Sequence, residues 1–586
     1  MRARLARLSG QLRFEHSMLL LLALLVGIAA GYGALGFRGL ISAWGLIAFG
    51  TTEENLIAGI VHLDWWHMLT APIVGGVLVS LLLRFALLAP RPQSVSEVIE
   101  AAALRDGRMS FRTGLANAVL NATALGFGSS VGREGPVVHL GAAIASGLSQ
   151  SLHLSPAMMR TLVGCGVASA VAASFNAPIA GVLFALEVVV GHYALHAFAP
   201  IVVAGVAGTV VSRIHLGNFP AFTLPELQIV STWEFPAFAL LGIGGAIVAI
   251  AFMQWTFVSG ELRRRWLPLP EWALPPVGGL LVGVTAIWVP EVIGVGYEGT
   301  DNALKGSYAL GALLLFLAAK ILLTGLCITL RFGNGVFSPA LFIGAMFGGA
   351  FGSIASGVFP ELGSPLGVYV IVGMGAVASA VLGAPISTIL IVFELTGDYT
   401  VTLAVMVAAA LASAFTHFAY GPSFFLKQLA RRGLALEAGK ASYLLKSTGV
   451  KAVMRTDFAT AQRHTPISEL RQMLIAQGGG KLPVTDDAGG LVGVIAFTDL
   501  PNVALDPVHD RETIAEQIVR SDPPVVFARD TLETGLRLLE RTGEHQIPVL
   551  SDPDSRAIIG MLDYEDVLRA YTTALLDAHG RLETTR

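Results

Sequence analysis

The chain has 586 residues, of which 54% are hydrophobic and only 13% charged, and its mean hydropathy is +0.68. Soluble proteins carry about 25% charged residues, so one water-facing globule cannot hide this many apolar side chains. The net charge of −3 provides no overall basic field, and we expect no nucleic-acid partner. Lipid must be the solvent for much of the chain, which predicts a multi-pass membrane protein.

Basic residues precede the first apolar run. Residues 1–15 hold four arginines and one acid, and the run that follows, His16–Tyr32, has no convincing small-residue cleavage site. We therefore expect a cytoplasmic N-terminal segment and a retained membrane helix. If the basic clusters Arg263–Arg265 and Lys427–Arg432 are also cytoplasmic, an even number of crossings separates each pair. Both termini are then cytoplasmic, and the expected membrane is the plasma membrane, in a bacterium the inner one.

Apolar segments follow one another to about residue 435, and several are too short to cross about 30 Å of hydrocarbon. The short ones, interrupted by Gly and Pro, are Pro136–Leu148, Ala177–Val190, Pro339–Phe351 and Pro385–Leu395. Irregular backbone at membrane depth is tolerated where it is buried or lines a cavity. Broken helices therefore indicate a transport site near the midplane, with re-entrant packing helices as the alternative.

The two halves of this region, about residues 16–215 and 230–430, share short motifs at an offset of about 205 residues. Each half has an Ala-Pro-Ile segment with a glutamate nine residues after the proline. These residues are Pro178 and Glu187 in the first half and Pro385 and Glu394 in the second. In each half a Gly-Ala pair also follows a loop proline at a fixed distance. The pattern predicts a duplicated fold whose halves are inverted in the membrane.

After about residue 446 the composition becomes that of a soluble domain. Two stretches, 446–505 and 512–575, each read as a β-branched strand, a turn, a second strand and a helix. The fold class predicted for the whole chain is therefore an all-α membrane region followed by a tandem α/β domain.

The segment Gly126–Pro136 carries the strongest chemical signal. Its glycines leave backbone amides bare, and Pro136 suits the first turn of a helix, whose N-terminus attracts anions. Glu134 stands where an anion would bind, so its carboxylate can occupy the site and leave when protonated. A salt bridge between Glu134 and Arg133 is the alternative reading.

A second segment, Gly333–Pro339, repeats this logic with a bare backbone and a proline in the first helical turn. The amides of Val336 and Phe337 are expected to face the ion. A tight loop between helices is the alternative.

At these motifs the sequence resembles the CLC family of chloride channels and chloride/proton antiporters over residues 16–435, with a CBS pair behind them. Gly132–Pro136 resembles the family's gating motif and Gly335–Pro339 its GxFxP motif, while the two Ala-Pro-Ile helices fit in order. The resemblance implies a homodimer with a pore in each subunit, chloride as the bound ligand, and Arg133 and Gly135 beside the gate Glu134.

The first departure from the family concerns its GSGIP segment, where a Ser hydroxyl coordinates the central anion. Counting back from Glu97, the equivalent here is Pro92–Ser96, so Gln93 takes the Ser place and Ser94 is a register-shifted rival. An amide still offers N–H donors. Because this position is linked to nitrate preference in the family, nitrate is a possible substrate.

Two further departures lie on the inner side. Phe425 replaces the family's inner coordinating Tyr and removes a hydroxyl donor, which predicts a leakier inner gate. Val188 stands where antiporters usually carry a Glu that passes protons to the cytoplasm. Val188 favours a passive channel, and a proton-coupled exchanger is the alternative, since some family antiporters lack this Glu.

In CBS pairs an Asp near each helix start can bind a nucleotide ribose, and Asp499 and Asp566 match it. The usual Ser or Thr three residues earlier is Ala496 in one copy and Asp563 in the other. Weak adenine-nucleotide binding or a purely dimer-stabilising role is expected.

Other function classes have little support. The sequence contains no nucleophile elbow and no Walker loop, and its two cysteines offer no metal spacing. His62 and His67 flank Asp64 and could suggest a metal site, but beside Trp65 and Trp66 an interfacial aromatic belt is the preferred interpretation. We therefore expect neither an enzyme nor a metal or resident cofactor. A nucleotide-sensing receptor with an inert membrane anchor is a third class, against which the broken helices argue.

Overall fold

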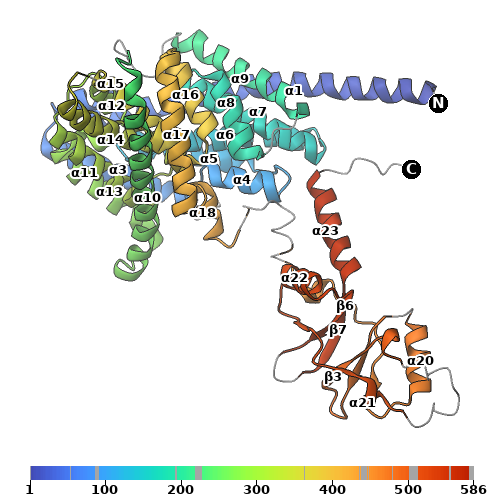
Figure 1. The fold of residues 1–586 in the computed structure, drawn as a ribbon. Helices are drawn as coiled ribbons and strands as arrows, with labels where there is room; N and C mark the ends of the chain where they lie inside the picture. The colour runs from blue at the N-terminus through green and yellow to red at the C-terminus, as the bar shows by residue number, and fades with distance from the viewer. Residues whose placement is uncertain are drawn as a thin grey trace. The chain divides into compact units, whose positions relative to one another are not determined.

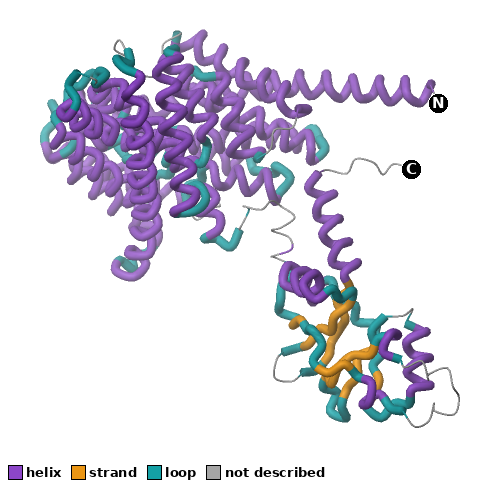
Figure 2. The backbone as a smooth tube through the Cα atoms, viewed as in Figure 1, coloured by secondary structure: helices purple, strands orange, loops and turns teal. Residues whose placement is uncertain are grey.

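The computed structural model describes residues 2–52, 55–85, 91–191, 195–217, 228–361, 363–434, 436, 445, 448–477, 480–500, 513–552 and 556–579. Two compact units divide at Gly433, and each is considered by itself. The expected domain boundaries at 435, 446, 505 and 512 lie outside the described residues. In the part that the structure describes, the first unit is helical and the strands belong to the second (Figure 2).

The first half of the membrane unit runs from blue to teal in Figure 1. Its helices are α1 (Arg2–Phe49), α2 (Leu56–Ile60), α3 (Trp65–Phe85), α4 (Val95–Leu104), α5 (Phe111–Gly126), α6 (Glu134–Ser151), α7 (Pro156–Phe175), α8 (Pro178–Phe184), η2 (Ala185–Val190) and α9 (Leu195–Leu216).

The second half continues through green to orange (Figure 1). Its helices are η3 (Thr232–Glu234), α10 (Phe235–Trp266), η4 (Glu271–Ala273), α11 (Leu274–Trp288), η5 (Pro290–Val292), α12 (Tyr297–Leu304), α13 (Leu310–Thr329), α14 (Phe337–Val358), α15 (Leu366–Leu382), α16 (Pro385–Thr396), α17 (Tyr399–Ala419) and α18 (Phe424–Ala430).

Nine helices in the described residues are long and apolar enough to cross a bilayer. The first is longer than the sequence predicted, because its apolar stretch runs over Ser17–Phe49 instead of ending at Tyr32. The expected short helices at Pro136–Leu148 and Pro339–Phe351 were also underestimated, since α6 and α14 begin before the proline and end later. Small residues such as Gly352 and Ser353 continue α14 beyond the apolar run by which its end was judged.

The two halves pack their helices in the same pattern. In the first, α7 contacts α6, α8 and α9, and α1 lies against α7 and α9. In the second, α15 contacts α14, α16 and α17, and α10 lies against α15 and α17. Equivalent helices therefore occupy equivalent places, which confirms the duplicated fold.

Paired glycines set a close helix crossing in each half. A Cβ built on Gly141 of α6 would overlap the carbonyl of Gly166 of α7, and the reverse also holds. Gly344 of α14 and Gly373 of α15 make the same reciprocal contact. Small residues let helix backbones approach closely in lipid, which explains the Gly-Ala pair found in each half of the sequence.

The repeated glutamates join the halves. Glu187 accepts hydrogen bonds from the N–H groups of Ile386 (3.2 Å) and Ser387 (2.8 Å) at the start of α16. Glu394, near the end of α16, accepts from the first amides of α8, with N···O distances of 3.0 and 2.8 Å. Each carboxylate fills the orphan donors at the partner helix's N-terminus. Since each start meets the other's C-terminal part, α8 and α16 run antiparallel, as inverted repeats require.

The second unit contains two similar sheets. The first half has η6 (Val450–Ala452), β1 (Ala461–Gln462), α20 (Ile467–Ala476), β2 (Leu482–Thr485), β3 (Leu491–Ile495), η7 (Phe497–Asp499), α21 (Ala515–Ile518) and β4 (Arg520–Ser521). The second has β5 (Val526–Phe527), α22 (Leu532–Thr542), β6 (Gln546–Leu550), β7 (Ile558–Asp563) and α23 (Tyr564–His579).

Strand pairing confirms that this unit is a tandem repeat. The sheet orders are β1-β2-β3-β4 and β5-β6-β7, and in each the first pair is parallel and the next antiparallel. Val484 pairs with Gly493 and Val549 pairs with Gly560, and a register irregularity follows each valine. The predicted fold class, broken helices in two inverted repeats plus an α/β tandem, is therefore confirmed.

Candidate functional site

Glu134 is the first residue of α6, and its side chain is fully buried. One carboxylate oxygen accepts a hydrogen bond from the Tyr297 hydroxyl at 2.8 Å, and the other accepts from the Ser338 hydroxyl. Both donors come from the second half of the membrane unit. The gate predicted in one repeat is thus held by side chains of the other.

Arg133 lies beside this carboxylate. Its Nε is 3.6 Å from a Glu134 oxygen, and its guanidinium stacks 4.5 Å from the centre of the Tyr297 ring. The salt bridge that the sequence left open is therefore an ion pair beyond ordinary hydrogen-bond distance. The cation stabilises the buried carboxylate and leaves the two hydroxyls as its hydrogen-bonding partners.

The two glycine-rich loops meet at this point. The Gly132 N–H donates to the Gly335 carbonyl at 2.8 Å, and Gly335 has a φ of +157°. A Cβ on Gly335 would overlap the Gly132 carbonyl, so a bare backbone is required. Val336 is the N-cap of α14 and Phe337 its first residue. The first-turn amides of α6 and α14 thus lie close together, where helix geometry leaves them without intrahelical partners.

The structure distinguishes the two candidates at the start of α4. A Cβ on Gly135 would overlap the Ser94 hydroxyl, so Ser94 lies directly against the first turn of α6. Gln93 instead lines a cavity of about 200 Å³ whose other lining residues include His139 but neither Ser94 nor Glu134. The contact with the first turn of α6 is therefore made by Ser94.

Phe425 is buried in the first turn of α18. Its ring centre lies 6.0 Å from that of Phe424, which stacks on Phe257. Helix α18 reaches α4 through a hydrogen bond between Ser96 and Gln428. Phe425 therefore belongs to the helix that packs next to α4, the helix that Ser94 caps. Its ring carries no hydroxyl group that could donate a hydrogen bond.

Val188 lies half-buried in the π-helical turn that ends at Val190. The neighbouring carboxylate, Glu187, is already bound to two amides of α16. The expected inner position is therefore apolar, and the adjacent acid has a structural role.

Comparison with known proteins identifies the family. A model described as "voltage gated chloride channel" matches residues 75–417. A ClcB-like chloride channel protein of Ralstonia nicotianae is 32% identical over 70% of this chain and 97% of its own length. The chain belongs to the CLC family. A second model, the CBS domain, matches residues 450–504 and 515–573.

Other CLC proteins extend the comparison. The H⁺/Cl⁻ exchange transporter ClcA of Vibrio cholerae is 32% identical over 53% of this chain and 67% of its own. The crystal structure of a eukaryotic CLC transporter matches in fold with a TM-score of 0.62 at 20% identity. That match covers 94% of this chain and 97% of the other. CLC relatives named as channels and as exchangers both occur, so the family establishes anion transport without choosing between the modes.

In the CBS pair of this CLC protein, an arginine engages each candidate aspartate. Arg520 donates from Nε to Asp499 at 2.7 Å. Arg455 lies 2.8 Å from both Asp566 and Asp563. Burial raises the pKa of Asp563, and the neighbouring Arg455 cation opposes that rise. A ribose would have to share each aspartate with its arginine.

The sequence did not predict two residues of this CLC site, Ser338 and Tyr297, or the buried cation Lys320, whose acceptor Val292 also accepts from Ser130 of the Gly126–Pro136 loop. Ser338 lay inside a quoted motif without a role, and Tyr297 lies in no recognisable pattern. Lys320 interrupts an apolar helix, which was the available signal. It is completely buried, and its ammonium donates to the carbonyls of Val292 (2.9 Å) and Gly294 (2.8 Å).

Proposed function

We propose that this CLC protein conducts chloride through a pathway closed by the Glu134 carboxylate. The supporting observation is its position: a buried acid at the N-terminus of α6, bound by two hydroxyls and facing α14. An anion entering this place would meet the Tyr297 and Ser338 hydroxyls that now bind the carboxylate, and the first-turn amides of α6 and α14 nearby. Protonation of Glu134 would weaken its hold on that place and open it.

Within anion transport we propose the passive mode. The apolar Val188 supports it, because a proton moving inward from Glu134 would find no carboxylate at that position. Proton-coupled exchange is the second candidate, favoured by the 32% identity to a protein named as an H⁺/Cl⁻ exchanger. Water could carry the proton past Val188 in that case.

The decisive experiment is chloride efflux from proteoliposomes with simultaneous recording of external pH. A passive channel lets chloride leave without moving protons once the membrane potential is clamped with valinomycin. Proton uptake against its gradient, in fixed ratio to chloride, would instead establish the exchanger. Glu134→Gln is expected to abolish the pH dependence while flux persists, whereas unchanged pH dependence would contradict the gate.

We further propose chloride over nitrate as the preferred substrate, because Ser94 and not Gln93 lies against the first turn of α6, a homodimer with one pathway per subunit, and an inner gate weakened by Phe425. Chloride, nitrate and fluoride gradients in the same vesicles test the first, with fluoride expected to pass poorly because Pro136 is present. Light scattering of the detergent-solubilised protein tests the second.

A further inference from the structure

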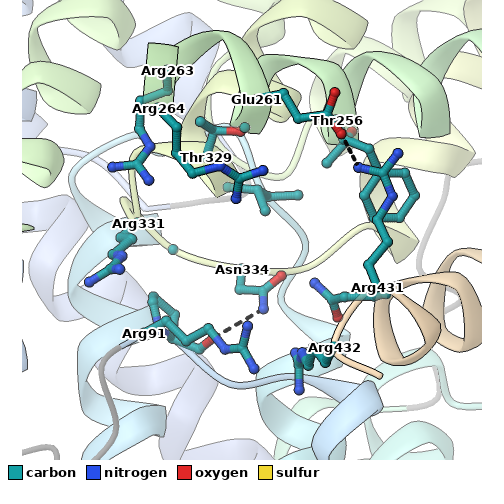
Figure 3. A pocket seen from close by; sticks show the side chains of 16 residues that line it. Arg91, Thr256, Glu261, Arg263, Arg264, Thr329, Arg331, Asn334, Arg431 and Arg432 are labelled. Carbon is teal, nitrogen blue, oxygen red and sulfur yellow. Dashed lines mark hydrogen bonds and ion pairs between the residues drawn. The ribbon is translucent and has the colours of Figure 1, made fainter. Parts of the chain in front are cut away.

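A large basic cavity lies in the membrane unit, away from the Glu134 carboxylate. Its volume is about 460 Å³, and the last turns of α10, the end of α18 and two loops line it (Figure 3). Six arginines contribute to the lining: Arg91, Arg263, Arg264, Arg331, Arg431 and Arg432. The two basic clusters that the sequence assigned to one side of the membrane thus meet around one cavity.

Carboxylates compensate only part of this charge. Glu261 is the single acid in the lining, and it binds Arg431 at 2.8 Å. Arg331 is bound by Glu271 at 2.7 Å. Arg432 is bound by Glu97 at 2.6 Å and lies 3.7 Å from Glu100, and Arg91 shares Glu97 at 3.8 Å, so four carboxylates face six arginines.

Arg263 and Arg264 make no ion pair with any residue that the structure describes. Burial and the nearby Arg432 charge lower the pKa of Arg91, another sign of crowded positive charge. Positive charge therefore exceeds negative charge in the lining, and a bound anion would relieve that excess.

One side of the cavity is formed by residues next to the two segments that approach the first turn of α6. Asn334 is buried there, and its amide donates to the Pro92 carbonyl at 3.2 Å. Asn334 immediately precedes Gly335, and Pro92 lies two residues before Ser94. A ligand in the cavity would therefore contact both the segment that contains Gly335 and the segment that contains Ser94.

The size and distribution of the arginines indicate the ligand. Guanidinium groups come from α10 on one wall, from the turn that follows α18 on another and from the Arg91 and Arg331 loops on a third (Figure 3). A single chloride ion is too small to contact all three walls. A chain of phosphates presents several charged oxygens in the forked geometry that arginine binds best.

We propose that this six-arginine cavity binds a polyphosphate group, such as a pyrophosphate or triphosphate chain, and that its occupation inhibits anion flux. Binding depends only on the cavity, whereas inhibition also rests on the proposed transport function. A soluble polyphosphate would supply this chain, whereas the phosphate monoester headgroup of an anionic lipid offers the same charged oxygens on a shorter group and would fill only part of the cavity.

Binding is tested by isothermal titration calorimetry of sodium tripolyphosphate into the full-length protein in detergent. Replacing the two arginines without an ion pair, Arg263→Gln with Arg264→Gln, should weaken binding at least about tenfold, because charge-assisted hydrogen bonds are lost. Arg265→Gln is the matched control, since Arg265 lies on the same helix turn but outside the lining and should leave binding unchanged. Equal binding by wild type and double variant, or an equal loss in the control, would overturn the site.

The flux arm uses vesicles of phosphatidylcholine alone and vesicles that also contain phosphatidic acid. In the first, tripolyphosphate should slow chloride efflux of the wild type and have at least about tenfold less potency on the double variant. If phosphatidic acid competes with tripolyphosphate in wild type but not in the double variant, the lipid headgroup is also a ligand of the cavity. Tight calorimetric binding without any effect on measurable efflux would overturn the inhibitory role, while absence of efflux altogether would count against the transport function and leave the binding result standing.

Discussion

Replacing Ser94 by alanine removes the hydroxyl that lies against Gly135 at the first turn of α6. A hydrogen bond to a charged group contributes about 1.5–3 kcal/mol, so Ser94→Ala should weaken chloride binding about 10- to 150-fold. Gln93→Ala should change it much less, because Gln93 lines a different cavity. Comparing the two variants shows directly whether Ser94 or Gln93 faces the anion.

The measurement is calorimetric titration of chloride into full-length protein in chloride-free detergent solution. Ser94 is also the N-cap of α4, so the melting temperature of each variant must be compared. Ser94→Thr keeps a hydroxyl and should restore most of the affinity. The reasoning would be refuted if Gln93→Ala lost affinity while Ser94→Ala kept it.

Four further substitutions follow from the contacts described above. Glu187→Gln and Glu394→Gln should each lower the stability of the detergent-solubilised protein by about 1–3 kcal/mol, measured by thermal unfolding, since each leaves helix-start amides facing a neutral acceptor; unequal effects would argue against their symmetric roles. Lys320→Met should lower both melting temperature and chloride efflux, because two buried carbonyls lose their donor, and unchanged values for both would disprove the supporting role. Arg455→Ala should loosen β7 in hydrogen exchange by about 1 kcal/mol or less at pH 7. The pKa of Asp563 is raised by burial, so its protonation as pH falls toward that pKa should recover the loss; a larger loss at acid pH would contradict this sign.

The sequence predicted the parts of the site that local chemistry determines. The glycine-rich loops, the first-turn prolines and the spacing of Glu187 and Glu394 each reflect a helix start, and those starts lie where the motifs indicated. The choice between Gln93 and Ser94 could not be made in the same way. It depends on which side chain the loop turns toward α6, and that direction is set by contacts far away in the sequence.

The full lengths of two helices and one distant partner of Glu134 could not be predicted from the sequence either. Apolar runs underestimated the lengths of α6 and α14, because small or polar residues such as Ser151, Gly352 and Ser353 continue each helix beyond its apolar stretch. Tyr297 lies 163 residues after Glu134, and no motif around Tyr297 predicts the hydrogen bond between them. Only the packing of the two halves brings it there.

Glu187, in η2 directly after α8, binds the start of α16, and Glu394 of α16 binds the start of α8. This reciprocal contact has an implication for how such a chain could arise. A single half would carry a glutamate near the C-terminal end of its short helix and unpaired amides at the N-terminus of that same helix. The glutamate cannot reach the amides of its own helix, because they lie at the opposite end. Two copies inserted in opposite directions could satisfy each other. A half-length ancestor would thus have needed dual topology in the bilayer, and gene fusion would then have fixed one copy in each orientation.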